Sequence, residues 1–104
     1  MAVNIREVVD WIVSNIGEIS SSKDVANHFG VRTDTLKKRF KLSQGLTMFQ
    51  FIKRLKVQRT KELLRASNLR CFEIAYLLKL GSPQHAARLF KRRCGLTMST
   101  YRKQ

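Results

Sequence analysis

Acidic residues are scarce in this sequence. Its 104 residues include 7 Asp plus Glu against 21 Lys plus Arg, which gives a formal net charge of +14. So few carboxylates, with no Ser-His-Asp arrangement and no glycine-rich phosphate loop, argue against an enzyme. The large positive charge instead favours a polyanionic partner, for which DNA, RNA and an anionic membrane surface are the alternatives.

Cysteine and long apolar runs are also scarce. Only Cys71 and Cys94 occur, without a C-x-x-C motif, so we expect two reduced, packed thiols in a cytoplasmic protein. No stretch approaches the roughly 18 apolar residues of a membrane span. Charges interrupt the apolar pattern of the N-terminus, which is not that of a signal peptide. We expect neither a metal nor another cofactor, because four candidate zinc ligands lack a ligand spacing: His28, Cys71, His85 and Cys94.

The sequence contains an internal repeat. The first copy has the motifs A-x-x-x-G-V, L-K-K-R-F-K and G-L-T-M, and the second has A-x-x-x-K-L, A-R-L-F-K and G-L-T-M. Phe40 and Phe90 are 50 residues apart, whereas Ala26 and Ala75 are 49 apart, so the second copy contains one additional residue. Each copy predicts a short apolar helix, a turn and a basic second helix, which is the pattern of a helix-turn-helix.

Hydrophobic periodicity and capping residues predict an all-α fold of about seven helices. Ser21 and Asp24 resemble a capping box, which predicts a helix start. Gly17 is expected to end the first helix, and Ser82 followed by Pro83 predicts another start. The expected helices cover about residues 3–16, 22–29, 34–42, 48–65, 72 to the turn at 79, 83–93, and 99 onward.

The helix expected at 48–65 contains neither Gly nor Pro, so it should be continuous and act as a stiff spacer. Its expected buried stripe is Phe51, Ile52, Leu55, Thr60, Leu63 and Leu64. Its expected exposed residues are Lys53, Arg54, Lys56, Arg59 and Lys61. We therefore expect two helix-turn-helix subdomains, at 1–47 and 67–104, joined by a linker helix at 48–66.

These residues resemble the DNA-binding domain of the AraC/XylS transcription regulators, in which a long helix joins two helix-turn-helix motifs. The stretch R-L-K-V-Q-R-T-K-E-L-L looks like the family's central helix, and the resemblance covers about residues 4–103. The doubled F-K-x-x-x-G pattern is more specific than one copy would be. The matching residues are Ala26, Gly30, Leu36, Phe40, Lys41 and Gly45, then Ile74, Ala75, Leu80, Arg88, Phe90, Lys91, Gly95, Leu96, Thr97, Tyr101 and Arg102.

Four positions depart from the family pattern. Lys79 stands where the second turn usually has Gly, and Leu80 replaces the usual Phe. Thr60 replaces a small apolar residue of the long helix, and Arg32 stands where a capping Ser is common. Because a non-glycine residue at positive φ costs about 1 kcal/mol, we expect the second turn to be shaped differently from the first or to be less stable.

The resemblance places base contacts on the second helix of each copy, at Thr33, Asp34, Lys37 and Lys38 and at Gln84, His85 and Arg88. Arg88 and the lysines can donate to guanine, and Gln84 can pair with adenine. Only one of the adjacent Lys37 and Lys38 can point straight into a groove. Asp34 either accepts from cytosine N4 or helps to cap its helix. His85 either contacts a base or is a solvated surface imidazole.

Phosphate contacts are expected from helix N-termini and from peripheral polar side chains. Thr47 and Thr97 occupy matching places and are expected to cap helices whose amides meet the DNA backbone. Each cation has the alternative of being only a solvated charge. The candidates are Arg32, Arg39, Lys41, Thr47, Arg54, Lys91, Arg92 and Thr97.

The expected function is sequence-specific binding of double-stranded DNA by a bacterial transcription regulator of the AraC type. The resemblance favours an activator, with RNA polymerase as its protein partner. Recognition helices about 34 Å apart would enter successive major grooves, so a monomer would bind an asymmetric site. The alternative is a non-specific or RNA-binding basic helical protein, although the deep, narrow major groove of RNA does not admit a helix.

Overall fold

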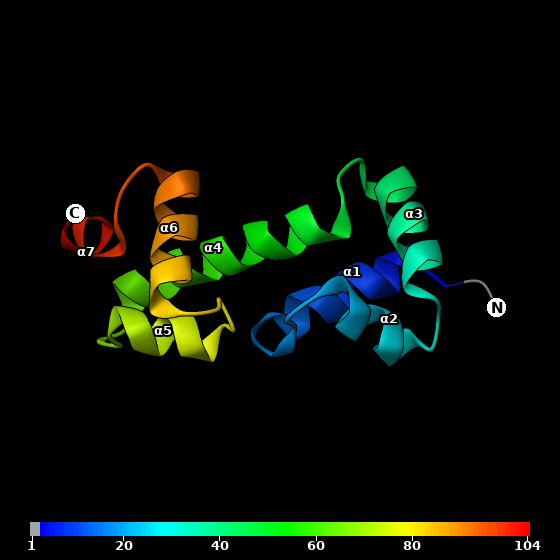
Figure 1. Cartoon of the computed structure of the whole chain (residues 1–104), viewed down its shortest axis with the longest axis horizontal. Coiled ribbons are helices and arrows are strands. Elements are labelled where there is room, and N and C mark those ends of the chain that lie inside the picture. The colour runs from blue at the N-terminus through cyan, green and yellow to red at the C-terminus, as the bar shows by residue number, and fades with distance from the viewer. Residues whose placement is uncertain (1–2) are drawn as a thin grey trace. The chain divides into compact units, whose positions relative to one another are not determined.

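A computed structural model describes residues 3–104, where all regular secondary structure is helical. In chain order (Figure 1) the helices are α1 (Ile5–Ser14), the short 3₁₀ helix η1 (Ile16–Glu18), α2 (Ser22–Phe29), α3 (Thr33–Gln44), α4 (Met48–Ala66), α5 (Cys71–Leu77), α6 (Pro83–Cys94) and α7 (Met98–Lys103). The prediction of an all-α fold with about seven helices is confirmed. None of the described helices is both long enough and apolar enough to cross a membrane.

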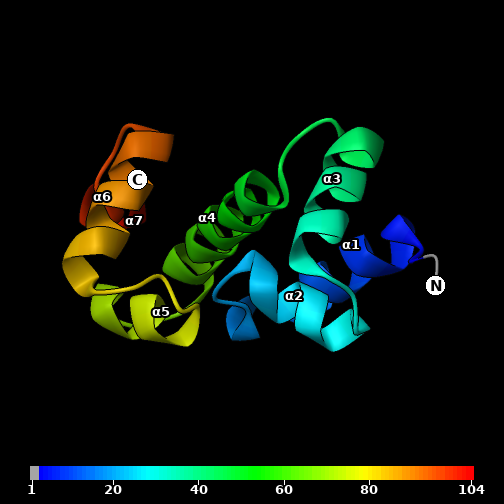
Figure 2. The ribbon, with the colours of Figure 1, turned by 45° about the vertical axis from the view of Figure 1, so that its right-hand side comes forward.

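The chain divides into two compact units, Met1–Leu55 and Lys56–Gln104. The division falls inside α4, so this helix supplies its first part to one unit and its second part to the other. Each unit holds one helix-turn-helix, α2–α3 in the first and α5–α6 in the second (Figure 2). The expected segments 1–47, 48–66 and 67–104 stay a prediction.

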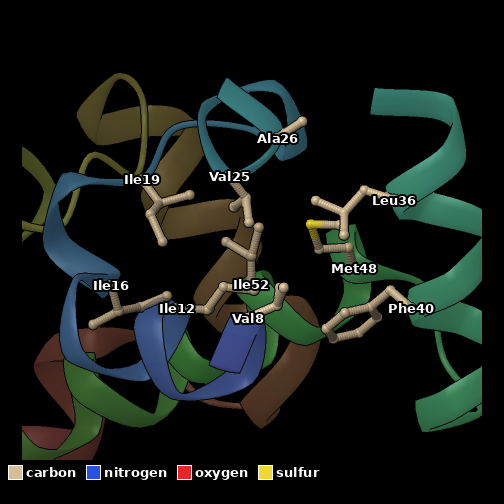
Figure 3. Close-up of a cluster of buried hydrophobic side chains, with 10 residues drawn as sticks. All are labelled: Val8, Ile12, Ile16, Ile19, Val25, Ala26, Leu36, Phe40, Met48 and Ile52. Carbon is tan, nitrogen blue, oxygen red and sulfur yellow. The ribbon is translucent and has the colours of Figure 1, made fainter. Parts of the chain in front are cut away.

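The core of the first unit forms where apolar side chains of helices α1 to α4 converge (Figure 3). Leu36 and Phe40 lie one turn apart on α3, so this helix directs a single apolar face inward. Complete burial of side chains of this size stabilises the fold by about 1.5–3 kcal/mol each. The buried cluster is Val8, Ile12, Ile16, Ile19, Val25, Ala26, Leu36, Phe40, Met48 and Ile52.

The core of the second unit repeats this arrangement. Phe90 and Met98, which are 50 residues after Phe40 and Met48, are buried like them. The repeat in the sequence therefore corresponds to one supersecondary unit that occurs twice. The buried cluster of the second unit is Val57, Leu64, Ile74, Ala75, Leu78, Leu80, Ala86, Leu89, Phe90 and Met98.

Three sequence expectations are corrected by the structure. The first helix ends at Ser14, and Gly17 lies inside η1, because Asn15 already donates its N–H back to Trp11 and Ile12 and closes α1. The helix expected at 34–42 extends over Thr33–Gln44 and ends at Gly45, whose φ is 79°. Lys56, expected on the exposed face of α4, is only 4% exposed.

Candidate nucleic-acid interface

The turn of the first helix-turn-helix is a left-handed glycine turn. Gly30 has a φ of 65°, and its N–H donates to the carbonyl oxygen of Asn27 at 3.2 Å. The next N–H, of Val31, donates to the carbonyl oxygen of Ala26 at 3.1 Å. These two bonds satisfy carbonyl groups at the end of α2 that have no partner within the helix.

The turn of the second helix-turn-helix begins with the same hydrogen bonds, with a lysine in place of the first left-handed glycine. Lys79 has a φ of 51°, and its N–H donates to Tyr76 O at 3.2 Å. Leu80 N donates to Ala75 O at 2.9 Å. The two turns therefore begin alike, but the second continues through an additional left-handed residue, Gly81, and so differs in shape from the first. Its lower stability stays a prediction.

Gly81 is the additional residue of the second copy. Equivalent positions are 49 residues apart up to Leu80 and 50 residues apart from Ser82 onward. Gly81 has a φ of 92°, a conformation that side chains rarely adopt, and a Cβ there would lie 3.1 Å from Cδ2 of His85. The imidazole of His85 therefore lies against a backbone position that has no side chain.

The two recognition helices, α3 and α6, begin differently. Before α6, the Oγ of Ser82 accepts a hydrogen bond from the N–H of His85 at 3.1 Å, and Pro83 occupies the first helical position. The expected helix start at Ser82 is confirmed. Before α3, Arg32 makes no side-chain hydrogen bond of this kind. Arg32 stands where the family commonly has a capping serine, so the first amide groups of α3 lack a hydrogen bond from a capping side chain.

Helix α3 presents a polar face opposite its buried residues. Leu36 and Phe40 are at most 1% exposed and fix the inward side. Because successive helix residues are about 100° apart, Lys38 lies almost directly opposite this pair, and Lys37 lies to the side. Lys37, Lys38 and Asp34 are all exposed, and Thr33 at the start of the helix is half-buried. Of the two adjacent lysines, Lys38 therefore has the more outward position.

Helix α6 presents an equivalent face. Ala86, Leu89 and Phe90 are buried and fix its inward side. Gln84 and Arg88 lie on the opposite side, at the positions that Asp34 and Lys38 hold on α3. Together with His85, both are exposed. The seven predicted base-contacting residues therefore form two sets, one on each recognition helix.

The repeat also identifies two positions that the sequence reasoning missed. Thr35 is the counterpart of His85 and is exposed on α3. Leu42 is the counterpart of Arg92, and it is 87% exposed although it is apolar. The 50-residue offset from His85 and Arg92 leads to Thr35 and Leu42, so the repeat itself was the signal for both positions.

Most of the predicted phosphate-contacting cations are accessible. Arg32, Lys41, Arg54, Lys91 and Arg92 are exposed, and Arg39 is half-buried on α3. Exposed cations therefore occur in both units, and such charges favour a polyanionic partner. The contacts with phosphate stay a prediction.

Thr47 and Thr97 cap the helices that follow the recognition helices, as predicted. The Oγ1 of Thr47 accepts from Gln50 N at 3.0 Å, and the amide of Thr47 donates to Oε1 of Gln50 at 3.0 Å. The Oγ1 of Thr97 accepts from Thr100 N at 3.1 Å. Both hydroxyl groups therefore fix the start of a helix, α4 or α7, while their contacts with DNA stay a prediction.

No three His, Cys, Asp or Glu side chains of residues 3–104 gather closely enough to hold a metal ion. Cys71 and Cys94 are free thiols, each half-buried. His28 stacks on Trp11, with ring centroids 4.1 Å apart. Both cysteines pack against the core of the second unit.

Comparison with protein families gives a match that covers most of the chain. A family model described as a helix-turn-helix domain matches residues 25–104. This range contains both turns described above and helices α3 to α7.

Named relatives and solved structures agree with this match. The chain is 30% identical over 98 residues to the HTH-type transcriptional activator AarP of Providencia stuartii, covering 94% of this chain and 73% of AarP. It is 29% identical over 86 residues to the HTH-type transcriptional activator RhaS of Yersinia pestis, where it spans 32% of the length of that relative. The crystal structure of the DNA-binding domain of AdpA in complex with a target DNA has the same fold. The TM-score is 0.87 at 24% identity, with 98% of this chain and 92% of that one covered.

Proposed function

Because this chain belongs to the AraC-type helix-turn-helix family of transcription regulators, we propose that α3 and α6 bind specific double-stranded DNA in successive major grooves. The proposed base contacts come from Thr33, Asp34, Lys37, Lys38, Gln84, His85 and Arg88. The proposed phosphate contacts come from Arg32, Arg39, Lys41, Thr47, Arg54, Lys91, Arg92 and Thr97.

One observation carries this proposal: the two recognition helices present equivalent outward faces that differ in chemistry. Lys38 and Arg88 occupy the same position, and both can donate to guanine O6 and N7. Asp34 and Gln84 also correspond, but one favours a cytosine amine and the other an adenine. The two half-sites should therefore differ in sequence, which suits one asymmetric site for a monomer.

The role of the bound chain is proposed from its relatives. AarP and RhaS are named as transcriptional activators, so we propose activation, with RNA polymerase as the protein partner. We propose a cytoplasmic location, where DNA and polymerase are found, and no catalytic activity. Helix α4 is proposed to act as the linker between the two DNA-binding subdomains.

Selection from random DNA duplexes tests this proposal. The chain is incubated with a random library and washed at about 150 mM salt, where non-specific phosphate binding is weak. We expect two enriched blocks centred about 10–10.5 base pairs apart. One block alone would show that only one recognition helix discriminates bases. Absence of any enriched block, with equal binding to RNA, would support the alternative of a non-specific basic protein.

A further inference from the structure

Lys56 on α4 is a buried charged residue that the proposed DNA contacts do not use. It is 4% exposed, although lysine is almost never buried without a partner. Its Nζ donates to the carbonyl oxygen of Lys79 at 3.0 Å. The carbonyl belongs to the left-handed residue of the second helix-turn-helix, so a buried cation on α4 is attached to the turn between α5 and α6.

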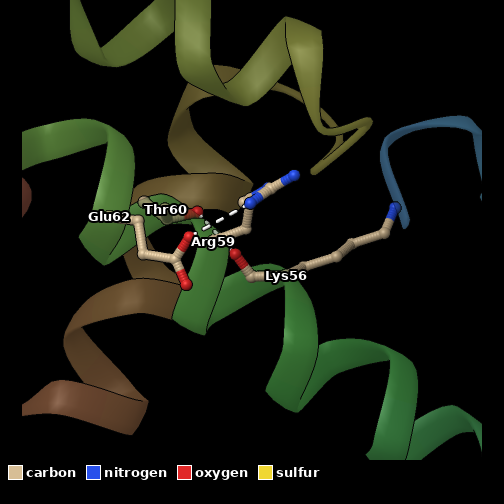
Figure 4. Close-up of polar contacts among 4 residues, drawn as sticks. All are labelled: Lys56, Arg59, Thr60 and Glu62. Carbon is tan, nitrogen blue, oxygen red and sulfur yellow. Dashed lines mark hydrogen bonds and ion pairs between the residues drawn. The ribbon is translucent and has the colours of Figure 1, made fainter. Parts of the chain in front are cut away.

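The same face of α4 is stabilised one turn further on. The Oγ1 of Thr60 donates to the carbonyl oxygen of Lys56 at 2.8 Å, and Thr60 is 1% exposed (Figure 4). A side-chain bond to a carbonyl four residues earlier satisfies the buried hydroxyl locally. On the outer side, Arg59 pairs with Glu62 at 3.1 Å in solvent. Lys56 thus extends from a buried, hydrogen-bonded part of the helix.

The hydrogen bond from Lys56 to Lys79 lies close in sequence to the predicted base-contacting residues of α6. Lys79 is the only non-glycine with positive φ in residues 3–104. The next residue, Leu80, is 6% exposed in the second core, and only Gly81 and Ser82 separate it from the start of α6. The turn is therefore held by the Lys79 carbonyl on one side and by the Leu80 side chain on the other. Both anchors lie shortly before Pro83, the first residue of α6.

We propose that Lys56 is a positioning residue for DNA recognition by the second motif, because its ammonium group holds the α5–α6 turn. Gln84 is the second residue of α6 and Arg88 lies one turn later. A displacement of the turn would move both side chains relative to a bound groove. This inference rests on the proposed function, since it assigns Lys56 a role in base discrimination rather than in affinity.

Two substitutions separate this role from a loss of charge. K56M removes the ammonium group and keeps an unbranched side chain, whereas K56R keeps a cationic donor. K61M is the matched control, because Lys61 is a half-buried lysine on the same helix and in the same unit. If K56M does not fold, K56Q replaces it, because its uncharged donor has a shorter reach and cannot contact Lys79 without moving the turn.

The first readout needs no DNA. Amide ¹H–¹⁵N spectra should show shifted peaks for residues 79–85 in K56M, unchanged peaks for the turn at residues 29–32, and smaller shifts in K56R. K61M should leave the peaks of residues 79–85 in place. Unchanged peaks for these residues in K56M would overturn the proposal.

The second readout is base discrimination by the selected duplexes. K56M should lose about tenfold or more of its base preference in the second block and retain its base preference in the first block. K56R should lose less base preference in the second block than K56M does. Equal preference in K56M and the unmodified chain would overturn the proposal. If the unmodified chain selects no sequence, the proposed function fails, and that failure is distinguishable because the amide shifts of K56M are measured separately.

Discussion

Arg102 on α7 closes the end of α4 by donating its Nε–H to the carbonyl oxygen of Leu64 at 2.9 Å. Its Nη2 also donates to the carbonyl oxygen of Ser67 at 3.2 Å. The last carbonyl groups of a helix have no partner within the helix, and the negative end of the helix dipole favours a cation there. Arg65 adds a second connection, because its Nε donates to the hydroxyl of Tyr101 at 2.9 Å. Helix α7 is therefore bound to the last turn of α4 by polar contacts.

Replacing Arg102 should destabilise the second unit. We expect R102A to lower the free energy of unfolding by about 1–3 kcal/mol, because two carbonyl groups lose a charged donor. R102K should recover part of the loss, since lysine keeps the charge but lacks the planar fork with which arginine contacts two separate carbonyl groups. Urea unfolding followed by circular dichroism measures the difference. K103A, an exposed change at the next residue, is the control, and an equal effect of both variants would contradict this role for Arg102.

Replacing Lys79 with glycine should stabilise the fold. Lys79 holds a left-handed conformation that costs a side-chain residue about 1 kcal/mol, so K79G should raise the free energy of unfolding by about 0.5–1 kcal/mol. The reverse change is G30A, where no atom lies within 4 Å of the added Cβ and only the backbone conformation is penalised. G30A should lower the stability by about 1 kcal/mol. Thermal unfolding of both variants measures these effects, and a destabilised K79G would show that the lysine side chain outweighs the strain.

The helices were predictable because their signals are local. Ser21 with Asp24, and Ser82 with Pro83, mark helix starts that the structure confirms, with Ser20 and Ser21 N–H groups both donating to Asp24. Gly17 misled because α1 already ends with its C-cap Asn15, and Gly17 continues a 3₁₀ helix without the left-handed conformation that favours glycine at a helix end. Ile16, the first residue of this 3₁₀ helix, is buried in the first core.

The site was predictable where the repeat gives two examples of each position. The 50-residue offset aligned Lys38 with Arg88, and both are exposed on recognition helices. Lys56 was missed because its burial depends on the carbonyl of Lys79, 23 residues later, and no local pattern shows that contact. A lysine among other lysines on a helix looks solvated, and only the tertiary structure shows that it is not.

Replacing Arg88 should change base preference more than affinity. Arg88 is exposed on the outward face of α6, so R88A should lose about 1–3 kcal/mol of discrimination at one position of the second block. R88K should lose part of it, because lysine lacks the planar fork that binds guanine twice. Arg92→Ala is the control, since a lost phosphate contact weakens binding about equally for all sequences. Competition binding with single-base variants measures both, and uniform weakening by R88A would assign Arg88 to the phosphate backbone.

The two adjacent lysines of α3 should have separable roles. Lys38 lies opposite the buried pair Leu36 and Phe40, whereas Lys37 lies about 100° around the helix axis from Lys38. K38A should therefore reduce discrimination at one position of the first block by about 1–3 kcal/mol. K37A should weaken all sequences alike and reduce the slope of log affinity against log salt by about 1.

Each lysine variant is the control for the other, because both remove one exposed cation from the same helix. Binding constants for duplexes that carry each of the four bases, measured at several salt concentrations, separate discrimination from affinity. If K37A loses base preference and K38A does not, α3 enters the groove rotated by about one residue from the orientation that its buried face implies. Thr33, one turn before Lys37, would then turn towards the bases, whereas Thr35, on the far side of the helix from Lys37, would turn away from them.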